Sequence, residues 1–395
     1  MPPAGDCKKK RRELCAAVYV HVPFCARKCR YCDFYSLPLP PPGARRGAGR
    51  YLDALAAELD ARAADLRTPL DSIFVGGGTP TVLPAATLGS LAALLRPLAG
   101  PATEWTVEAN PGTLTAAKAA RLAAAGVNRV SLGAQSFEAG ELRTLGRLHR
   151  PADIARAAAL VCAAGIDNIG LDLIYGIPGQ TQESWRATLA RALALRPAHL
   201  SCYCLSYELH TPLAADRRAG RVAEMPEARQ EACYRLAIAL ADEAGLEHYE
   251  ISNFALPGRR CRHNLACWHN EPYLGLGPAA ASFLGGRRRT NRADLDAYAS
   301  AALAGRAAPA TAERLTGLAA AAETAMLALR LIDGLDRATF AARHGMDVTE
   351  AFPHSIRRHV ETGSLVLTAT RLRIAGEYLF LADAVLADIV AEGRR

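Results

Sequence analysis

The chain of 395 residues lacks the features that mark membrane-spanning, exported and repeat-built proteins. No apolar run reaches the roughly 20 residues that cross a bilayer. The basic run KKKRR (8–12) has no apolar segment behind it, so we expect no secretory signal. Neither an internal repeat nor a long linker is visible. These absences predict a globular cytoplasmic protein, with residues 1–17 as a solvated basic tail.

The 11 cysteines lack the pattern of a disulfide framework. Their number is odd, and no export signal is visible, so we expect reduced thiols. Three of them, Cys25, Cys29 and Cys32, crowd into VPFCARKCRYCDFYS (22–36). No second CxxC supplies the remaining ligand of a closed tetrahedral zinc site. An iron–sulfur cluster with one iron open to a small molecule is favoured, while zinc or three unrelated buried thiols remain alternatives.

The net charge of +8 is not concentrated in one large basic segment. Arginines are scattered along the chain, and only GRRRTNR (286–292) forms a dense basic cluster. A positive protein favours anionic ligands, but this pattern does not predict nucleic-acid binding.

Short apolar segments alternate with Ala/Leu-rich helical stretches through the first 250 residues. The predicted strands are AVYVHVPF, SIFVGGG, WTVEANP, RVSLGAQSF, IGLDLIYGIPG and HLSCYCLSYEL. Such alternation predicts parallel βα units, in an α/β barrel or an open doubly wound sheet. About six units are readable, so we predict a partial (β/α)6 TIM-like barrel with its active site at the carboxyl ends of the strands.

The pattern changes near residue 305, where helices are followed by two short strands in SLVLTATRLRIAG. This order predicts a small C-terminal winged-helix-like α+β domain. The predicted divisions are therefore a barrel over 18–250, a connecting segment over 251–304, and the C-terminal domain over 305–395.

The CxxxCxxC spacing, with the aromatic Tyr31 before the last cysteine, resembles the hallmark of the radical S-adenosylmethionine (SAM) superfamily. That resemblance implies a [4Fe-4S] cluster on Cys25, Cys29 and Cys32, with SAM chelating the open iron through its amino and carboxylate groups. The glycines of GGGTPT (76–81) allow a ligand to approach the backbone closely. The SAM-site residues that the resemblance implies are Tyr19, Gly77, Gly78, Thr79, Glu108, Gln135, Arg147 and Asp172.

More narrowly, residues 18–290 resemble the oxygen-independent coproporphyrinogen III oxidase-like family, through the cysteine stretch, GGGTPT, EANPGT, GAQSF and DLIYGIPGQT. The oxidase itself has a further cysteine two residues after the third, where this chain has Phe34. The related HemW-type heme chaperones have an aromatic residue there and an HNxxYW motif implicated in heme binding. This chain has HNLACW, with His263 in place and Cys267 at the tyrosine position.

The resemblance implies a heme-binding chaperone that transfers heme to hemoproteins, with His263 as an axial heme ligand. A capping or core role for His263 is the alternative. For the whole chain the alternative is an oxidase that decarboxylates the propionates of coproporphyrinogen III, so enzymatic activity stays open. DNA binding by the C-terminal domain ranks last. Transient membrane association and a homodimer are further interpretations left open.

Overall fold

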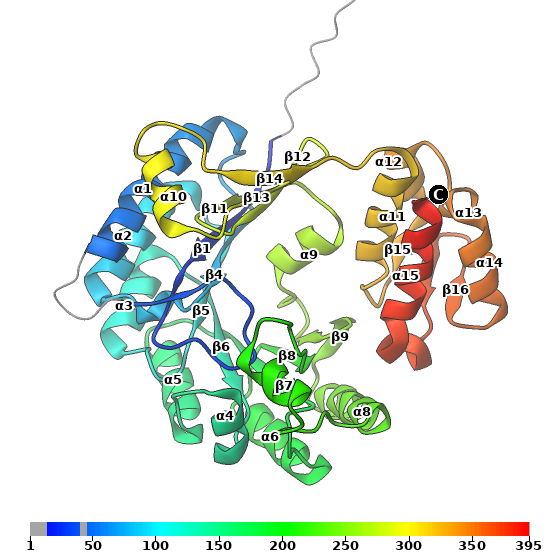
Figure 1. The fold of residues 1–395 in the computed structure, drawn as a ribbon, viewed down its shortest axis with the longest axis horizontal. Helices are drawn as coiled ribbons and strands as arrows, with labels where there is room; N and C mark the ends of the chain where they lie inside the picture. The colour runs from blue at the N-terminus through cyan, green and yellow to red at the C-terminus, as the bar shows by residue number, and fades with distance from the viewer. Residues whose placement is uncertain (1–13, 40–45, 395) are drawn as a thin grey trace, which may run out of the picture.

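In the computed structural model, residues 14–39 and 46–394 are described, so most of the predicted basic tail lies outside these ranges. A twelve-stranded sheet curves through the molecule, and its six central strands are parallel and adjacent in chain order (Figure 1). These strands are β1 (Ala17–Val22), β4 (Ser72–Gly77), β5 (Glu104–Ala109), β6 (Arg129–Gln135), β7 (Asn168–Tyr175) and β8 (His199–Cys204). The predicted partial (β/α)6 barrel is confirmed.

Helices cover the outer face of this curve (Figure 1). They are α1 (Arg46–Arg62), α2 (Ala85–Leu95), α3 (Ala116–Ala125), α4 (Ala139–Leu145), α5 (Pro151–Ala163), α6 (Gln182–Ala194) and α8 (Glu227–Glu243). Local sequence signals define their ends. Helix α5 begins at Pro151, whose missing N–H is not needed in the first turn, and Gly165 follows it with φ +90°. The Thr115 hydroxyl caps α3 by accepting from the Lys118 N–H.

Both edges of the parallel sheet are extended by segments that follow β8. Strands β9 (Glu247–Glu250) and β10 (Asn253–Ala255) add to β8, whereas β11 (Tyr273–Leu276) pairs in parallel with β1. Strands β12 (Ala281–Leu284), β13 (Arg287–Asn291) and β14 (Ala310–Glu313) then continue antiparallel beyond β11. The remaining elements here are α7 (Pro212–Arg218), α9 (Arg262–Trp268) and α10 (Leu295–Ala302).

The central strands present different chemistry on their two faces. Val18, Val20 and Val22 of β1 are fully buried in the apolar core, whereas Tyr19 and His21 alternate with them. The register aligns Tyr19 with Phe74, and Phe74 in turn with Thr106 of β5. The alternate residues of neighbouring strands therefore form tiers on the inner face, and many of their side chains are polar.

The C-terminal domain contains the helices α11 (Gly317–Ala328), α12 (Arg337–His344), α13 (Val348–Ala351), α14 (Pro353–Glu361) and α15 (Ala382–Gly393). Its antiparallel sheet has the order β15 (Leu335–Asp336), β17 (Arg371–Ile374), β16 (Leu365–Leu367). The predicted small α+β domain is confirmed. The three domain boundaries stay predictions, and β14 pairs with the large sheet although it lies beyond residue 305.

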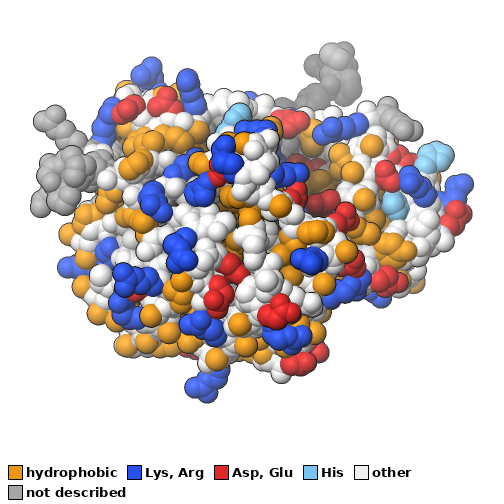
Figure 2. Space-filling model, turned by 60° about the horizontal axis from the view of Figure 1, so that its bottom comes forward, with side chains coloured by type: hydrophobic (Ala, Val, Ile, Leu, Met, Phe, Trp, Pro, Cys, Tyr) orange, Lys and Arg blue, Asp and Glu red, His pale blue; other side chains and the backbone are white. Residues whose placement is uncertain are grey.

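Figure 2 shows basic and acidic side chains interspersed over one face of the molecule. The dense basic cluster in the sequence forms β13, where Arg288 pairs with Glu323 and Arg289 donates to the Ala308 carbonyl. Within residues 14–39 and 46–394, no helix combines the length and apolar character needed to cross a bilayer.

Candidate functional site

A cavity of about 700 Å³ lies on the inner face of the barrel, between the cysteine loop and helix α9. Ten of the twelve predicted SAM-site, cluster and heme residues line it, namely Cys25, Cys29, Cys32, Gly77, Gly78, Thr79, Glu108, Gln135, Arg147 and Asp172. The structure thus brings together residues from a stretch of nearly 150 positions. Tyr19 and His263 are outside this lining.

The glycines at the end of β4 bring the cysteine loop against the barrel. A Cβ at Gly76 would lie 2.6 Å from Glu108 Oε2, and one at Gly77 would overlap the His21 ring. A Cβ at Gly78 would lie 2.5 Å from the Phe24 carbonyl oxygen, at the start of the cysteine loop. The Gly78 N–H donates to Val22 and the Thr79 N–H to Phe24, at 2.9 and 2.7 Å. Glycine is therefore required by close packing within the protein.

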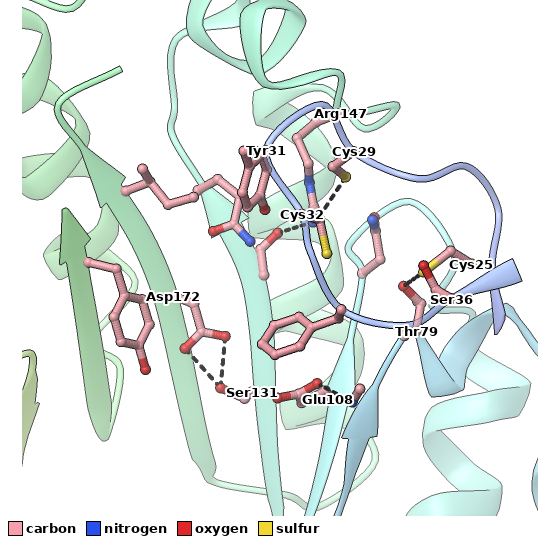
Figure 3. Close-up of a pocket in the computed structure, with 18 of the residues that line it drawn as sticks. Cys25, Cys29, Tyr31, Cys32, Ser36, Thr79, Glu108, Ser131, Arg147 and Asp172 are labelled. Carbon is pink, nitrogen blue, oxygen red and sulfur yellow. Dashed lines mark hydrogen bonds between the residues drawn. The ribbon is translucent and has the colours of Figure 1, made fainter. Parts of the chain in front are cut away.

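The three clustered cysteines lie at the mouth of the cavity, flanked by the two-residue strands β2 (Phe24–Cys25) and β3 (Leu37–Pro38). Figure 3 shows Arg147 directed toward Cys29, whereas Cys25 lies beside Thr79. The Arg147 Nη1–Cys29 Sγ distance is 3.6 Å, and the Cys25 Sγ–Thr79 Oγ1 distance is 3.5 Å. In the described part of the chain, no three His, Cys, Asp or Glu side chains already form a metal-binding group.

The chemistry of this donor set nevertheless fits an iron–sulfur cluster. Three soft sulfur ligands face one cavity, and iron–sulfur clusters are held by thiolates. Burial raises the pKa of the Cys32 thiol to about 11, so a bound cation is needed to hold it as thiolate. The guanidinium of Arg147 adds positive charge next to Cys29.

A bulge in β6 turns Gln135 toward the cavity and provides a backbone carbonyl that holds Arg147 there. The register with β7 shifts between Gly133 and Gln135, and Gln135 has φ +66°. Such a left-handed backbone costs energy for a residue other than glycine and is concentrated at functional sites. Arg147 Nη2 donates to the Gly133 carbonyl at 2.5 Å, and a Cβ at Gly133 would lie 3.1 Å from the same nitrogen. The bulge, the glycine and the arginine therefore form one unit.

Two half-buried carboxyl groups, Glu108 and Asp172, face the cavity from β5 and β7. Burial, followed by the neighbouring Asp172, raises the pKa of Glu108 to about 7. Burial also raises the pKa of Asp172, although the Ser131 hydroxyl lies 3.0 and 3.1 Å from its two oxygens. The Gly77 N–H donates to Glu108 at 3.1 Å. Both groups are placed to accept hydrogen bonds from hydroxyl groups of a ligand.

His263 lies beneath the cavity, in helix α9, and only 6 % of it is exposed. Its ring is surrounded by Tyr19, Phe74 and Tyr273, with centroid distances of 6.2, 5.3 and 6.1 Å. Its Nδ1 is 3.2 Å from the Ser72 hydroxyl. Burial lowers the pKa of His263 to about 4, so the imidazole is neutral at physiological pH. A neutral imidazole is the form that binds a metal.

Sequence reasoning missed several cavity residues that follow one another at two-residue intervals along a strand. Ser131 precedes Gly133, and Arg129 precedes Ser131 on the same strand. His199 and Ser201 have the same relation on β8. The two-residue period of a strand was the available signal, because alternate side chains share a face.

Comparison with known proteins gives a consistent result. Residues 19–192 match the radical SAM superfamily, and residues 315–377 match the HemN C-terminal domain. The heme chaperone HemW of Synechocystis sp. is 36% identical over 343 residues, which are 85% of this chain and 82% of that protein. The heme chaperone HemW of Bacillus subtilis is 32% identical over 383 residues, 95% of this chain and 99% of the relative.

A solved structure shares the fold. Coproporphyrinogen III oxidase (HemN) from Escherichia coli, a radical SAM enzyme, superposes with a TM-score of 0.80. The two sequences are 24% identical, and the match covers 96% of this chain and 90% of the other.

The packing at Gly78 predicts that Gly78→Ala displaces the cysteine loop. We expect a loss of about 1–3 kcal/mol in unfolding free energy and a lower iron content after cluster reconstitution. Urea unfolding and iron analysis measure these effects. Gly49→Ala on α1 is the control, because nothing lies within 4 Å of its Cβ position. Equal iron content in both variants would contradict the proposed role of Gly78.

The raised pKa of Glu108 predicts a pH-dependent stability for the ligand-free protein. Between its ordinary value of 4.5 and about 7, the folded state holds a proton that the unfolded state has released. Unfolding free energy therefore decreases as pH rises through this range, by about 3 kcal/mol from Glu108. Urea unfolding at pH 5 and pH 8 should show that Glu108→Gln removes this decrease. Glu361→Gln, at an exposed position, should retain it.

Proposed function

Because the chain belongs to the HemW heme chaperones of the radical SAM superfamily, we propose that it binds heme and transfers it to hemoproteins. The observation that carries the proposal is the similarity to a named heme chaperone over 95% of this chain and 99% of the relative. We further propose that a [4Fe-4S] cluster and SAM occupy the barrel cavity.

Cys25, Cys29 and Cys32 would hold the cluster at the cavity mouth, leaving one iron without a protein ligand. When bound, the cluster supplies an open coordination position and an electron. Arg147, beside Cys29, would pair with the carboxylate of SAM through its guanidinium. Glu108 and Asp172, deeper in the cavity, would accept hydrogen bonds from ribose hydroxyls. Each role is supported by the position of the side chain in the cavity lining.

His263 would supply the axial ligand to heme iron through Nε2. The Ser72 hydroxyl, 3.2 Å from Nδ1, can accept a hydrogen bond from Nδ1–H and so favour the tautomer with Nε2 unprotonated. The three aromatic rings around His263 offer apolar surface for a porphyrin. Since the imidazole is almost fully buried, iron reaches it only when α9 or these rings move. The association rate of heme should therefore be below the diffusion limit.

Phe34 distinguishes this chain from the oxidase, and Cys267 departs from the HNxxYW motif. Phe34 is 66% exposed at the cavity mouth, where the oxidase has a further cysteine. Cys267 replaces the expected tyrosine of HNxxYW, and burial raises its pKa to about 11. Tyr273 provides a phenol close to His263, and its hydroxyl accepts from Arg288 at 3.0 Å. We propose that Tyr273 serves the role of the missing tyrosine. Membrane association and a homodimer stay predictions.

The ligand role of His263 is tested by heme titration of the reconstituted protein. His263→Ala should shift the Soret band and weaken heme binding by about tenfold or more, since an iron ligand is lost. His248→Ala is the matched control, because His248 is half-buried, also has a lowered pKa, and stacks on Phe254 outside the HNLACW segment. An unchanged heme spectrum in His263→Ala would assign His263 to the core instead.

Consumption of coproporphyrinogen III with SAM, yielding protoporphyrinogen IX, would contradict the chaperone proposal. The assay uses the same reconstituted protein, and we expect no decarboxylated product.

The cluster assignment predicts that Cys25→Ser lowers iron and sulfide content after anaerobic reconstitution to a small fraction of that of the unmodified protein. Removing one of three thiolates leaves the cluster with too few ligands. Cys162→Ser is the control, because Cys162 is an exposed cysteine on α5, away from the cavity lining. Full cluster content in Cys25→Ser would refute the assignment of Cys25.

A further inference from the structure

Two buried polar side chains meet on the floor of the barrel cavity, away from the cysteine loop. Arg129 at the start of β6 is 2% exposed, and His199 at the start of β8 is 1% exposed, yet both line the cavity. Gly170 of β7 lies between them in the sheet. A Cβ at Gly170 would lie 3.4 Å from Arg129 Nη2 and 3.6 Å from His199 Nδ1. The two side chains therefore converge on the space that this glycine leaves free.

Arg129 is poorly satisfied by the described residues. Its five N–H donors have one hydrogen bond there, from Nη1 to the Thr106 hydroxyl at 3.4 Å, and its Nε is buried without a partner. No carboxylate of the described chain lies within ion-pairing distance of it. An unpaired buried charge costs several kcal/mol of free energy. A protein retains such a charge where a bound ligand pairs with it and offsets this cost.

The nearby carboxylates are engaged elsewhere. Glu104 Oε1 accepts from the Arg262 N–H at 2.8 Å, and both oxygens of Asp172 accept from Ser131. Burial lowers the pKa of Arg129, but Cys261, Glu104, Tyr249 and Asp172 together raise it above its ordinary value, so the guanidinium stays charged. The site thus keeps a positive charge with free donors.

His199 shows the same incomplete pairing. Its Nε2 is 2.8 Å from the Tyr249 hydroxyl, whereas its Nδ1 is buried without a partner among the described residues. When the Tyr249 hydroxyl donates to Nε2, Nδ1 carries the proton and becomes a donor into the cavity. Burial and Arg129 both lower the pKa of His199, so it remains neutral and adds a donor without a second charge.

We propose that Arg129 and His199 form a carboxylate-binding subsite on the cavity floor. A planar guanidinium matches the two oxygens of a carboxylate, and one positive charge beside a neutral imidazole balances a single negative charge. A phosphate dianion would leave one charge uncompensated in this buried position. The cavity then has a cation at each end, with Arg147 at the mouth and Arg129 on the floor.

The identity of the carboxylate rests on the proposed function. Two ligands of such a protein carry one: heme through its propionates, and SAM through its methionyl group. In the second case Arg129, rather than Arg147, would hold the single carboxylate of SAM. Asn264, which lines the same cavity floor, directly follows His263 in α9. The floor is therefore adjacent to the proposed heme ligand as well as to the proposed SAM cavity.

Binding to reconstituted full-length protein tests the subsite with two pairs of ligands, which are heme with heme dimethyl ester and SAM with decarboxylated SAM. Arg129→Met should weaken the carboxylate-bearing member of one pair by about tenfold to a hundredfold. The partner that lacks the carboxylate should bind Arg129→Met as it binds the unmodified protein. The pair that responds identifies the source of the carboxylate.

A second variant preserves the charges. Gly170→Ala places a methyl group in front of Arg129 and His199 and should weaken the same ligand, whereas Gly376→Ala has an open Cβ position and should not. If Arg129→Met does not fold, Gly170→Ala still tests whether Arg129 and His199 bind a carboxylate.

Unchanged binding of all four ligands in both variants would overturn the subsite. Equal weakening of a ligand and its carboxylate-free partner would also overturn it, because Arg129 would then act through the environment of His263. Failure of the unmodified protein to bind heme would reject the chaperone proposal alone, and the SAM pair would still decide the subsite.

Discussion

The contact between the β4 glycines and the cysteine loop is the constraint on which the site depends. Gly76, Gly77 and Gly78 leave room for the Glu108 carboxyl group, the His21 ring and the Phe24 carbonyl. Each of these contacts connects the carboxyl end of β4 to a segment that is distant from it in sequence. The loop with the three cysteines is therefore positioned by backbone packing before any ligand binds. A side chain at these positions would move the loop and the carboxylate together.

The two faces of the barrel strands have different roles: the outer face contributes to stability, and the inner face carries the polar side chains of the site. Outward side chains such as Val20 and Leu132 are fully buried against the helices and supply the apolar core. Inward side chains include Glu108, Arg129 and Asp172, whose burial costs free energy. The protein tolerates this cost because the outer face of the same strands offsets it. Ligands that carry hydroxyl and carboxylate groups would recover part of it on binding.

Local patterns were sufficient to predict the strands, the helix starting at Pro151, the cysteine cluster and the family. Each of these depends on residues close in sequence, such as Cys25, Cys29 and Cys32. The pairing of β11 with β1 was not predicted, because about 250 residues separate them. Arg129 and His199 were missed for the same reason: their convergence depends on sheet register, and neither belongs to a motif. The enclosure of His263 likewise results from rings on three different strands.

Helix α9 connects the two proposed binding regions. His263 contacts Ser72 below the barrel, whereas the next residue, Asn264, lines the cavity. Arg129 acts on both sides, since it faces the cavity and its charge helps to lower the pKa of His263. A displacement of α9 that admits heme iron to His263 would therefore also move the cavity floor. Binding linkage is reciprocal. If a ligand that orders this floor changes the affinity for heme by some factor, heme changes the affinity for that ligand by the same factor.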